Sequence, residues 1–347
     1  MNQLPKIIFV YPFKSSFIRK DEELLKLKFN VISLFFQPIP KYRTPIVMLI
    51  QAFQLVKHIR GCRGIVCQFA GFHTFFPVII GRIFDVKISI VLLGAECHNY
   101  PNIQHGNYRK TLLRMFTRFT FQFANQLLPI DQSLVKFNNN YDKTEPKDQG
   151  ILGLFPNLKT KYQVIPHGFN DSQFILSEVS AKPKTFITAA SSIAPPVFQR
   201  KGIDLILEAA KELPDCHFTI LCKNNYLNPD DLPINVKLLE AVPYEKLPQV
   251  LASHKYYIQA SIAEGLPNAL CEAMLCGCIP IGSSVFAIPY IIDNTGIIIN
   301  ERSSDALVLG IKNLINNDEF SAEKSRLRIQ ELFPISTREK LLAEAIV

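Results

Sequence analysis

The sequence predicts an α/β protein built from two doubly wound, Rossmann-like domains that face each other across a cleft. Short apolar runs alternate with longer stretches of helical spacing, which is typical of a parallel sheet with helices on both sides. The alternation stops near residue 170 and then begins again. The length of 347 residues is sufficient for two domains that each bury a core.

The first half contains six candidate strands, at residues 6–11, 31–36, 64–68, 87–93, 126–130 and 161–165. Helical spacing is clearest at 44–59 and 108–123. The first of these helices places five apolar residues on one face: Ile46, Leu49, Ile50, Phe53 and Val56. Polar residues between 138 and 150 predict an exposed loop.

The second half repeats the pattern after a polar linker at 169–183. Its candidate strands are 186–190, 217–222, 236–239, 255–259 and 279–282, and its candidate helices are 201–211, 244–252, 268–276 and 303–316. We therefore divide the chain into domains at 1–170 and 171–335. A final helix within 336–347 is expected to pack back on the first domain.

Composition indicates a folded globular protein, because 48% of residues are hydrophobic and 20% are charged. The sequence contains no run of about 18 apolar residues, so it predicts no transmembrane helix. The first apolar run is interpreted as a buried strand and not as a signal peptide. The eight cysteines form no CxxC pair. We expect reduced, mostly buried thiols in a cytoplasmic protein, with no metal site.

Charge is distributed unevenly along the chain. Residues 1–170 hold 22 Lys and Arg against 9 Asp and Glu, whereas residues 171–347 hold 16 against 21. The basic first half favours an anionic partner, such as a membrane surface or a phosphorylated lipid. Nucleic-acid binding fits the charge, but no motif supports it, so we expect no nucleic-acid partner.

The segment SIAEGLPNALCE, residues 261–272, carries the most informative chemistry. It passes from a strand through a polar turn into a helix, and the amides at a helix start can hold a phosphate. Glu264 and Glu272 can each accept hydrogen bonds from the neighbouring hydroxyls of a sugar or ribose. On the residues alone a second interpretation stays open, in which Glu264 caps the helix and Glu272 is a surface residue.

The same segment with its continuation, EGLPNALCEAMLCGCIPIGSSVFAIPYII, resembles the signature of family 4 of the retaining glycosyltransferases. The resemblance implies the GT-B fold, a nucleotide diphosphate sugar as co-substrate, no other cofactor and no metal. It also implies that Glu264 binds the donor sugar and Glu272 the ribose, with further donor contacts from Gly265, Leu266, Pro267, Asn268 and Leu270.

FITAASSIAPPVFQRKGIDLILEAAKEL, residues 186–213, resembles the start of the family's second domain. Lys201 stands at the position of the lysine that neutralises the donor's pyrophosphate. The family's usual Gly-Arg is replaced by Ser191 and Ser192, so we expect Arg200 to supply the lost charge. Without the resemblance, Arg200 and Lys201 are equally well a solvated pair at a helix start.

The first half is similar to bacterial members that build surface polysaccharides. Ser16 lies in the first strand–helix loop, which flanks the phosphates in that family. The family's acceptor-side His-Gly-x-Asp aligns with residues 93–96, where Glu96 stands in place of the aspartate and the histidine is missing. His98 is the candidate replacement, whereas His73, His105 and His167 are interpreted as structural or surface residues.

We therefore expect a retaining, metal-independent glycosyltransferase that acts on a glycan or a lipid-linked acceptor, in polysaccharide or lipopolysaccharide biosynthesis. The helix at 108–123 has Arg109, Lys110, Arg114 and Arg118 beside an aromatic face. Either it lies on an anionic membrane, which would make the protein peripheral on the inner face of the cytoplasmic membrane, or its aromatics are core. Two other functions stay open: a nucleotide-sugar epimerase on the same fold and a non-catalytic GT-B scaffold.

Overall fold

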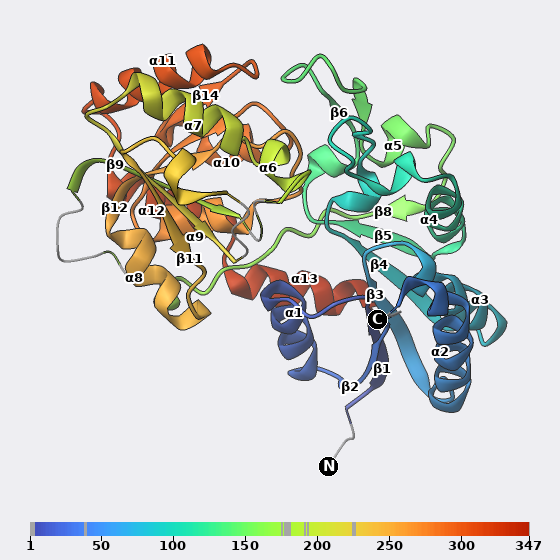
Figure 1. Cartoon of the computed structure of the whole chain (residues 1–347). Coiled ribbons are helices and arrows are strands. Elements are labelled where there is room, and N and C mark those ends of the chain that lie inside the picture. The colour runs from blue at the N-terminus through green and yellow to red at the C-terminus, as the bar shows by residue number, and fades with distance from the viewer. Residues whose placement is uncertain are drawn as a thin grey trace.

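The computed structural model describes residues 4–37, 40–174, 176, 182–190, 192, 194–223 and 227–346. Its strands form two six-stranded sheets, one in each half of the chain, and a small antiparallel pair. Every strand pairing within the two large sheets is parallel. Figure 1 shows the two sheets side by side, each with its own helices. The predicted fold class of two doubly wound domains is confirmed.

The first sheet has the order β2-β1-β3-β4-β5-β8. Its central strands are mostly apolar because helices cover both faces of a parallel sheet. Ile7, Ile8, Phe9 and Val10 of β1 are fully buried. The strands are β1 (Lys6–Tyr11), β2 (Asn30–Phe35), β3 (Cys62–Gln68), β4 (Lys87–Leu92), β5 (Gln126–Pro129) and β8 (Lys161–Tyr162). The helices are α1 (Ser16–Lys26), α2 (Thr44–His58), α3 (Phe75–Ile83), α4 (Thr111–Phe123) and α5 (Ile151–Leu154).

The second sheet has the order β11-β10-β9-β12-β13-β14. Its strands are β9 (Lys182–Ala190), β10 (His217–Cys222), β11 (Val236–Glu240), β12 (His254–Gln259), β13 (Ile279–Ser283) and β14 (Ile297–Ile299). The helices of this half are α6 (Val197–Arg200), α7 (Ile203–Glu212), α8 (Leu247–Ala252), α9 (Asn268–Leu275), α10 (Ile288–Ile292), α11 (Ser304–Ile315) and α12 (Ala322–Leu332). The carboxyl ends of β9, β10 and β12 lead into the loops that line the site described below.

The last helix, α13 (Ile335–Ile346), returns to the first half of the chain and packs against α1, β3 and β4 (Figure 1). Arg338 on this helix is 2% exposed. Its Nη2 lies 2.6 Å from Oδ2 of Asp21 on α1, and its Nε lies 3.0 Å from Oδ1 of the same carboxylate. A bidentate buried ion pair therefore joins the two ends of the chain.

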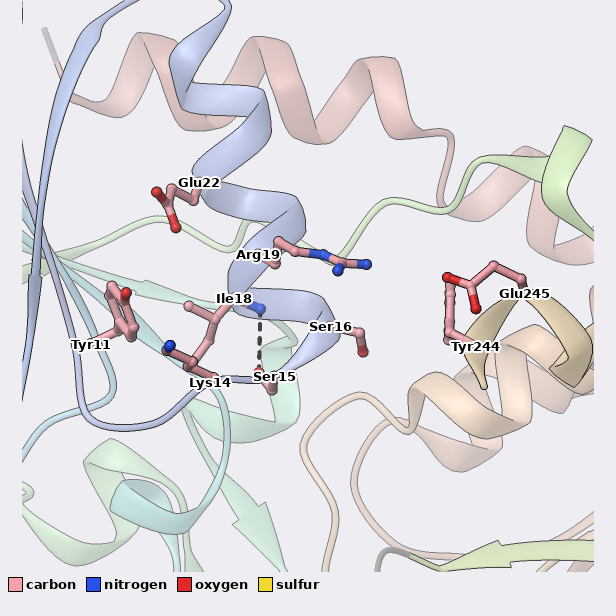
Figure 2. A pocket seen from close by; sticks show the side chains of 9 residues that line it. All are labelled: Tyr11, Lys14, Ser15, Ser16, Ile18, Arg19, Glu22, Tyr244 and Glu245. Carbon is pink, nitrogen blue, oxygen red and sulfur yellow. Dashed lines mark hydrogen bonds between the residues drawn. The ribbon is translucent and has the colours of Figure 1, made fainter. Parts of the chain in front are cut away.

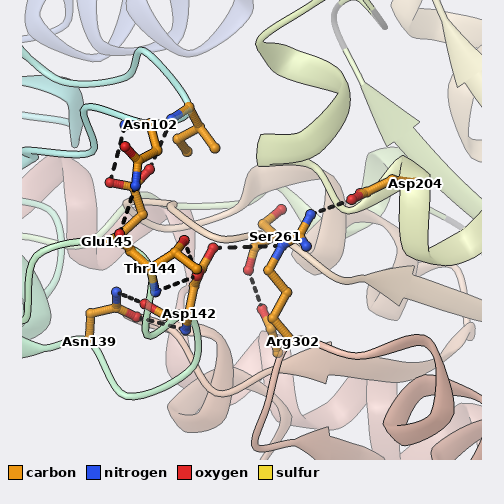
Figure 3. Close-up of polar contacts among 10 residues, drawn as sticks. Asn102, Asn139, Asp142, Thr144, Glu145, Asp204, Ser261 and Arg302 are labelled. Atoms are coloured by element: carbon orange, nitrogen blue, oxygen red, sulfur yellow. Dashed lines mark hydrogen bonds and ion pairs between the residues drawn. The ribbon is translucent and has the colours of Figure 1, made fainter.

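The segment 138–150, which was expected to be an exposed loop, is only about half exposed: six of its residues are buried, and six are exposed. Its ends belong to β6 (Phe137–Asn138) and β7 (Asp148–Gln149), and its middle packs against the second domain at Arg302. Asp142 is 6% exposed, and its Oδ2 lies 3.7 Å from Nε of Arg302, which also pairs with Asp204 (Figure 3). The prediction of exposure was wrong for the buried half, because polar side chains there bond to one another and to a domain far away in the sequence.

All eight cysteines carry free thiols, and seven of them are buried. Across the described part of the chain, no helix is both long and apolar enough to cross a membrane. The described residues likewise contain no cluster of His, Cys, Asp and Glu arranged to hold a metal ion.

Candidate functional site

A cavity of about 550 Å³ lies between the two domains. Its walls come from α1 and the loops of the first sheet on one side, and from the carboxyl ends of the second sheet's strands on the other, which is where open α/β sheets bind ligands. Most of the residues predicted from the sequence line it: Ser16, Arg200, Lys201, Glu264, Gly265, Leu266, Pro267, Asn268 and Glu272. The tertiary structure therefore brings the two separate motifs of the second half to one surface.

Lys201 and Glu264 form an ion pair in the wall of this cavity. Nζ of Lys201 lies 2.6 Å from Oε1 of Glu264, and the two side chains are 16% and 10% exposed. Gln259 and Ser261 donate hydrogen bonds to the same oxygen, at 3.0 and 2.8 Å. Burial alone would raise the pKa of Glu264, but Lys201 and Arg200 outweigh it and hold this pKa below its usual value. Glu264 is therefore an ionised, fixed carboxylate.

The position of Lys201 depends on the glycine that follows it. Gly202 has φ +67°, and a Cβ on it would lie 2.1 Å from the carbonyl oxygen of Ala260. Only glycine combines this left-handed backbone with so close an approach. The short helix α6 and its lysine are thereby held against the end of β12, next to Glu264.

Neither alternative interpretation of the two glutamates fits the structure. The N-cap of α9 is Pro267, which makes no side-chain capping bond, and the side-chain bonds of Glu264 go to Lys201, Gln259 and Ser261. Glu272 is 6% exposed and lines the cavity, so it is not a surface residue.

Glu272 is linked to the first domain through Tyr244 and Lys20. Oη of Tyr244 donates to Oε1 of Glu272 at 2.8 Å, and Nζ of Lys20 donates to the same Oη at 2.8 Å. Burial raises the pKa of Glu272, and the charge of Lys20 and the bond from Tyr244 oppose the shift. Sequence analysis missed Tyr244 and Lys20. The position of Tyr244, just beyond the carboxyl end of β11, is the signal that would have found it.

A second cavity of about 580 Å³ adjoins the first. Ser16 and Tyr244 line both cavities. Figure 2 shows Ser16 and Arg19 pointing from α1 toward Tyr244 and Glu245 across the opening. Lys14 and Arg19 bring positive charge to this second space, and Glu22 and Glu245 bring negative charge.

The predicted acceptor-side residues Glu96 and His98 are buried beneath the cavity and do not line it. Glu96 is fully buried, and its Oε1 accepts a hydrogen bond from the backbone of Leu93 at 2.6 Å. That bond fixes the loop whose Leu93 carbonyl faces Gly265, where an added Cβ would lie 2.2 Å from the oxygen. Nδ1 of His98 lies 3.1 Å from Nε2 of His105, and burial lowers the pKa of His98 to about 3.

Three further predicted residues have other outcomes. Leu270 is fully buried in the core, so its side chain does not reach the cavity. Ser191 lies outside the described residues. His167, interpreted from the sequence as structural or surface, lines the cavity, and burial lowers its pKa to about 3.

Glu96→Gln is expected to stabilise the fold above neutral pH. Burial raises the pKa of Glu96 to about 7, whereas the unfolded value is about 4.3. The folded state therefore binds the proton more tightly, and wild-type stability falls as pH rises between these two values. Glutamine does not ionise, so the variant does not lose stability as the pH rises. Its free energy of unfolding at pH 8 should therefore exceed that of the wild type by roughly 3 kcal/mol.

Urea unfolding of both proteins at about pH 5 and pH 8 measures this difference. The exposed Glu344→Gln retains Glu96 and is the control, so its stability should equal that of the wild type at both pH values. A stability difference between Glu96→Gln and the wild type that is equal at both pH values would contradict the prediction.

Comparison with known proteins adds to this geometry. Residues 184–317 match the family model described as Glycosyl transferases group 1, and the matched range includes Lys201, Glu264 and Glu272. A component of the phosphatidylinositol N-acetylglucosaminyltransferase of Arabidopsis thaliana is 24% identical over 201 residues, which are 55% of this chain and 43% of that protein. The chain thus spans less than half the length of that relative.

Similar folds occur among solved structures. Sucrose-phosphate synthase from Thermosynechococcus elongatus superposes with a TM-score of 0.77 at 13% identity, over 99% of this chain and 98% of that one. Anabaena HepE, solved in complex with UDP and glucose, gives a TM-score of 0.70 at 15% identity, over 98% and 99%. The fold is GT-B. The GT-B fold and the family match of the second domain together support a glycosyltransferase.

Proposed function

We propose that this protein transfers a sugar from a nucleotide diphosphate sugar to a glycan or lipid-linked acceptor, with retention of configuration. The observation that carries the proposal is the Lys201–Glu264 pair in the interdomain cavity, with Arg200 beside it. One wall thus offers both cations for a diphosphate and a fixed carboxylate for sugar hydroxyls. The ligands of HepE, UDP and glucose, favour a UDP-sugar as the first donor to test.

In the proposed reaction the bond between the anomeric carbon and the diphosphate oxygen breaks, and a bond to an acceptor oxygen forms. Negative charge builds on the departing diphosphate, so the cations of Lys201 and Arg200 stabilise it as it leaves. The start of α9, at Asn268, adds the positive end of a helix dipole. These groups supply positive charge without a metal ion, which supports the proposal of metal independence.

The two carboxylates have separate roles in this proposal. Glu264 accepts hydrogen bonds from the donor sugar, and Glu272 accepts them from the ribose. Because Lys201 already pairs with Glu264, an arriving diphosphate shares this cation and draws it toward the cavity. Ser16, where the two cavities meet, faces the diphosphate from the acceptor side. Retention is supported by the resemblance of the Glu264–Glu272 motif to the retaining family.

Calorimetry with UDP, GDP and ADP, followed by transfer assays with labelled UDP-glucose, tests the proposal. We expect one nucleoside diphosphate to bind, to raise the melting temperature and to be released during transfer, with EDTA having no effect. The anomeric configuration of the product, read by NMR, tests retention. Epimerised sugar formed without an acceptor would favour an epimerase, and no binding of any nucleoside diphosphate would favour a scaffold.

A further inference from the structure

Helix α2 exposes the apolar face that its sequence pattern marks out. The side chains it buries are Met48, Gln51 and Leu55. The five apolar residues predicted to share one face are all exposed, at 59% for Ile46, 64% for Leu49, 53% for Ile50, 73% for Phe53 and 50% for Val56. A contiguous apolar surface of this kind on a folded domain marks a site of interaction.

The apolar surface continues onto the two neighbouring helices. α3 packs against both α2 and α4, and Figure 1 shows the three helices on the side of the first domain away from the second domain. Ile83 at the end of α3 is 71% exposed, and Leu112 and Met115 of α4 are 59% and 61% exposed. Two aromatic residues of α4, Phe116 and Phe119, pack on Phe75 of α3, whereas Phe123 is 38% exposed. We call this surface the α2–α4 face.

The α2–α4 face is bordered by cations with almost no acids. Residues 40–123 contain 11 Lys and Arg but only two acids, Asp85 and the buried Glu96. The exposed basic residues along these helices are Lys41, Arg43, Lys57, Arg82, Arg109, Lys110, Arg114 and Arg118. None of them forms an ion pair with another described residue.

The geometry points to the α2–α4 face as the surface on which this protein lies on a bilayer containing anionic lipids. Exposed apolar side chains beside unpaired cations match the acyl chains and headgroups of such a bilayer. Self-association through this face would bring cations against cations, which disfavours a second copy of the chain. The exposed apolar side chains run along the side of α2 from Ile46 to Val56, so the helix would lie in the plane of the interface.

Membrane binding through this face does not depend on the proposed function, because no residue of α2, α3 or α4 lines the cavity between the domains.

Sedimentation with vesicles tests the inference. The probe is phosphatidylcholine vesicles with and without roughly one quarter phosphatidylglycerol. We expect the full chain to bind only the anionic vesicles, and less strongly in high salt. The double variant Ile50→Gln/Phe53→Gln should reduce the partition coefficient at least about tenfold, and Lys110→Gln/Arg114→Gln about thirtyfold.

Two matched double variants on the second domain serve as controls. Leu309→Gln/Leu327→Gln removes apolar side chains that are 61% and 54% exposed, and Lys211→Gln/Lys312→Gln removes two exposed cations. Both should bind vesicles as the wild type does. Calorimetry with UDP on the α2 variant separates this test from the proposed function, because nucleotide binding should be unchanged.

Absence of wild-type binding to anionic vesicles would overturn the inference. So would equal vesicle binding by the α2 variant and its control. If light scattering instead shows that the wild type is a dimer and that Ile50→Gln/Phe53→Gln is a monomer, the face belongs to self-association and not to lipid.

Discussion

Glu264→Gln is expected to lower kcat/KM for sugar transfer by a factor of about 100 to 1,000. The substitution keeps the shape and the acceptor oxygen but removes the charge that holds Lys201 at 2.6 Å. An amide binds sugar hydroxyls less strongly than an ionised carboxylate does. The substitution also leaves Lys201 free to adopt other rotamers before the diphosphate arrives. The contact of residue 264 with the donor sugar and the contact of Lys201 with the diphosphate are therefore weakened together.

The measurements are kcat/KM with the donor found by the binding screen, and the dissociation constant of its nucleoside diphosphate. Glu240→Gln, at the exposed end of β11, is the matched control and should act as the wild type does. Because Lys201 and Arg200 hold the pKa of Glu264 low, its ionised form should persist as pH falls to about 5. Wild-type kcat/KM in Glu264→Gln would remove this residue from the proposed reaction.

Arg338→Met is expected to reduce the free energy of unfolding by about 3–5 kcal/mol. Asp21 and Arg338 are 2% exposed each, and Asp21 also accepts a bond from Gln68 at 2.7 Å. Without the guanidinium, Asp21 becomes a buried charge that lacks its counter-ion. Because α13 packs on the first domain through this pair, the loss should loosen the attachment of the last helix.

Urea unfolding at pH 7 measures the effect, and Lys340→Met on the exposed side of α13 is the control. Burial raises the pKa of Asp21, but Arg338 outweighs it and the pKa is lowered. The stability that the pair contributes is therefore present above the unfolded pKa of about 3.9 and is lost as pH falls through the folded value. The double variant Asp21→Asn/Arg338→Met should recover part of the loss, and a stability of Arg338→Met equal to that of Lys340→Met would contradict the prediction.

The strands and the two motifs of the second half could be predicted because each is a local signal. Buried parallel strands appear as short apolar runs, so ten of the eleven predicted strands end within one residue of the observed end. The exception is the strand expected at 161–165, which ends at Tyr162. The helix expected at 108–123 begins as a helix at Thr111, after a turn at Asn107–Arg109. Lys201, Glu264 and Glu272 were identified from the resemblance of their two motifs to a known family, and all three line the cavity.

Pairs that join distant segments could not be found in this way. The series of hydrogen bonds Lys20–Tyr244–Glu272 links residues more than 200 positions apart, and the charge of Arg338 on α13 adds to the burial that lowers the pKa of His167. Glu96 and His98 were chosen by alignment with a motif, but whether they face a ligand depends on the path of the loop after β4. Half of the loop at 138–150 is buried although it is polar, because its buried side chains form hydrogen bonds with one another and an ion pair with Arg302.

The sequence by itself determined two doubly wound domains and a donor-type motif at the start of a helix, because period and spacing are properties of a single segment. Only the tertiary structure decided that Lys201 pairs with Glu264, that Glu272 meets Tyr244, and that the apolar face of α2 is exposed. The sequence pattern of an apolar helix face is the same whether that face packs in a protein core or on a bilayer. Which of these it meets depends on the elements that the rest of the chain packs beside it.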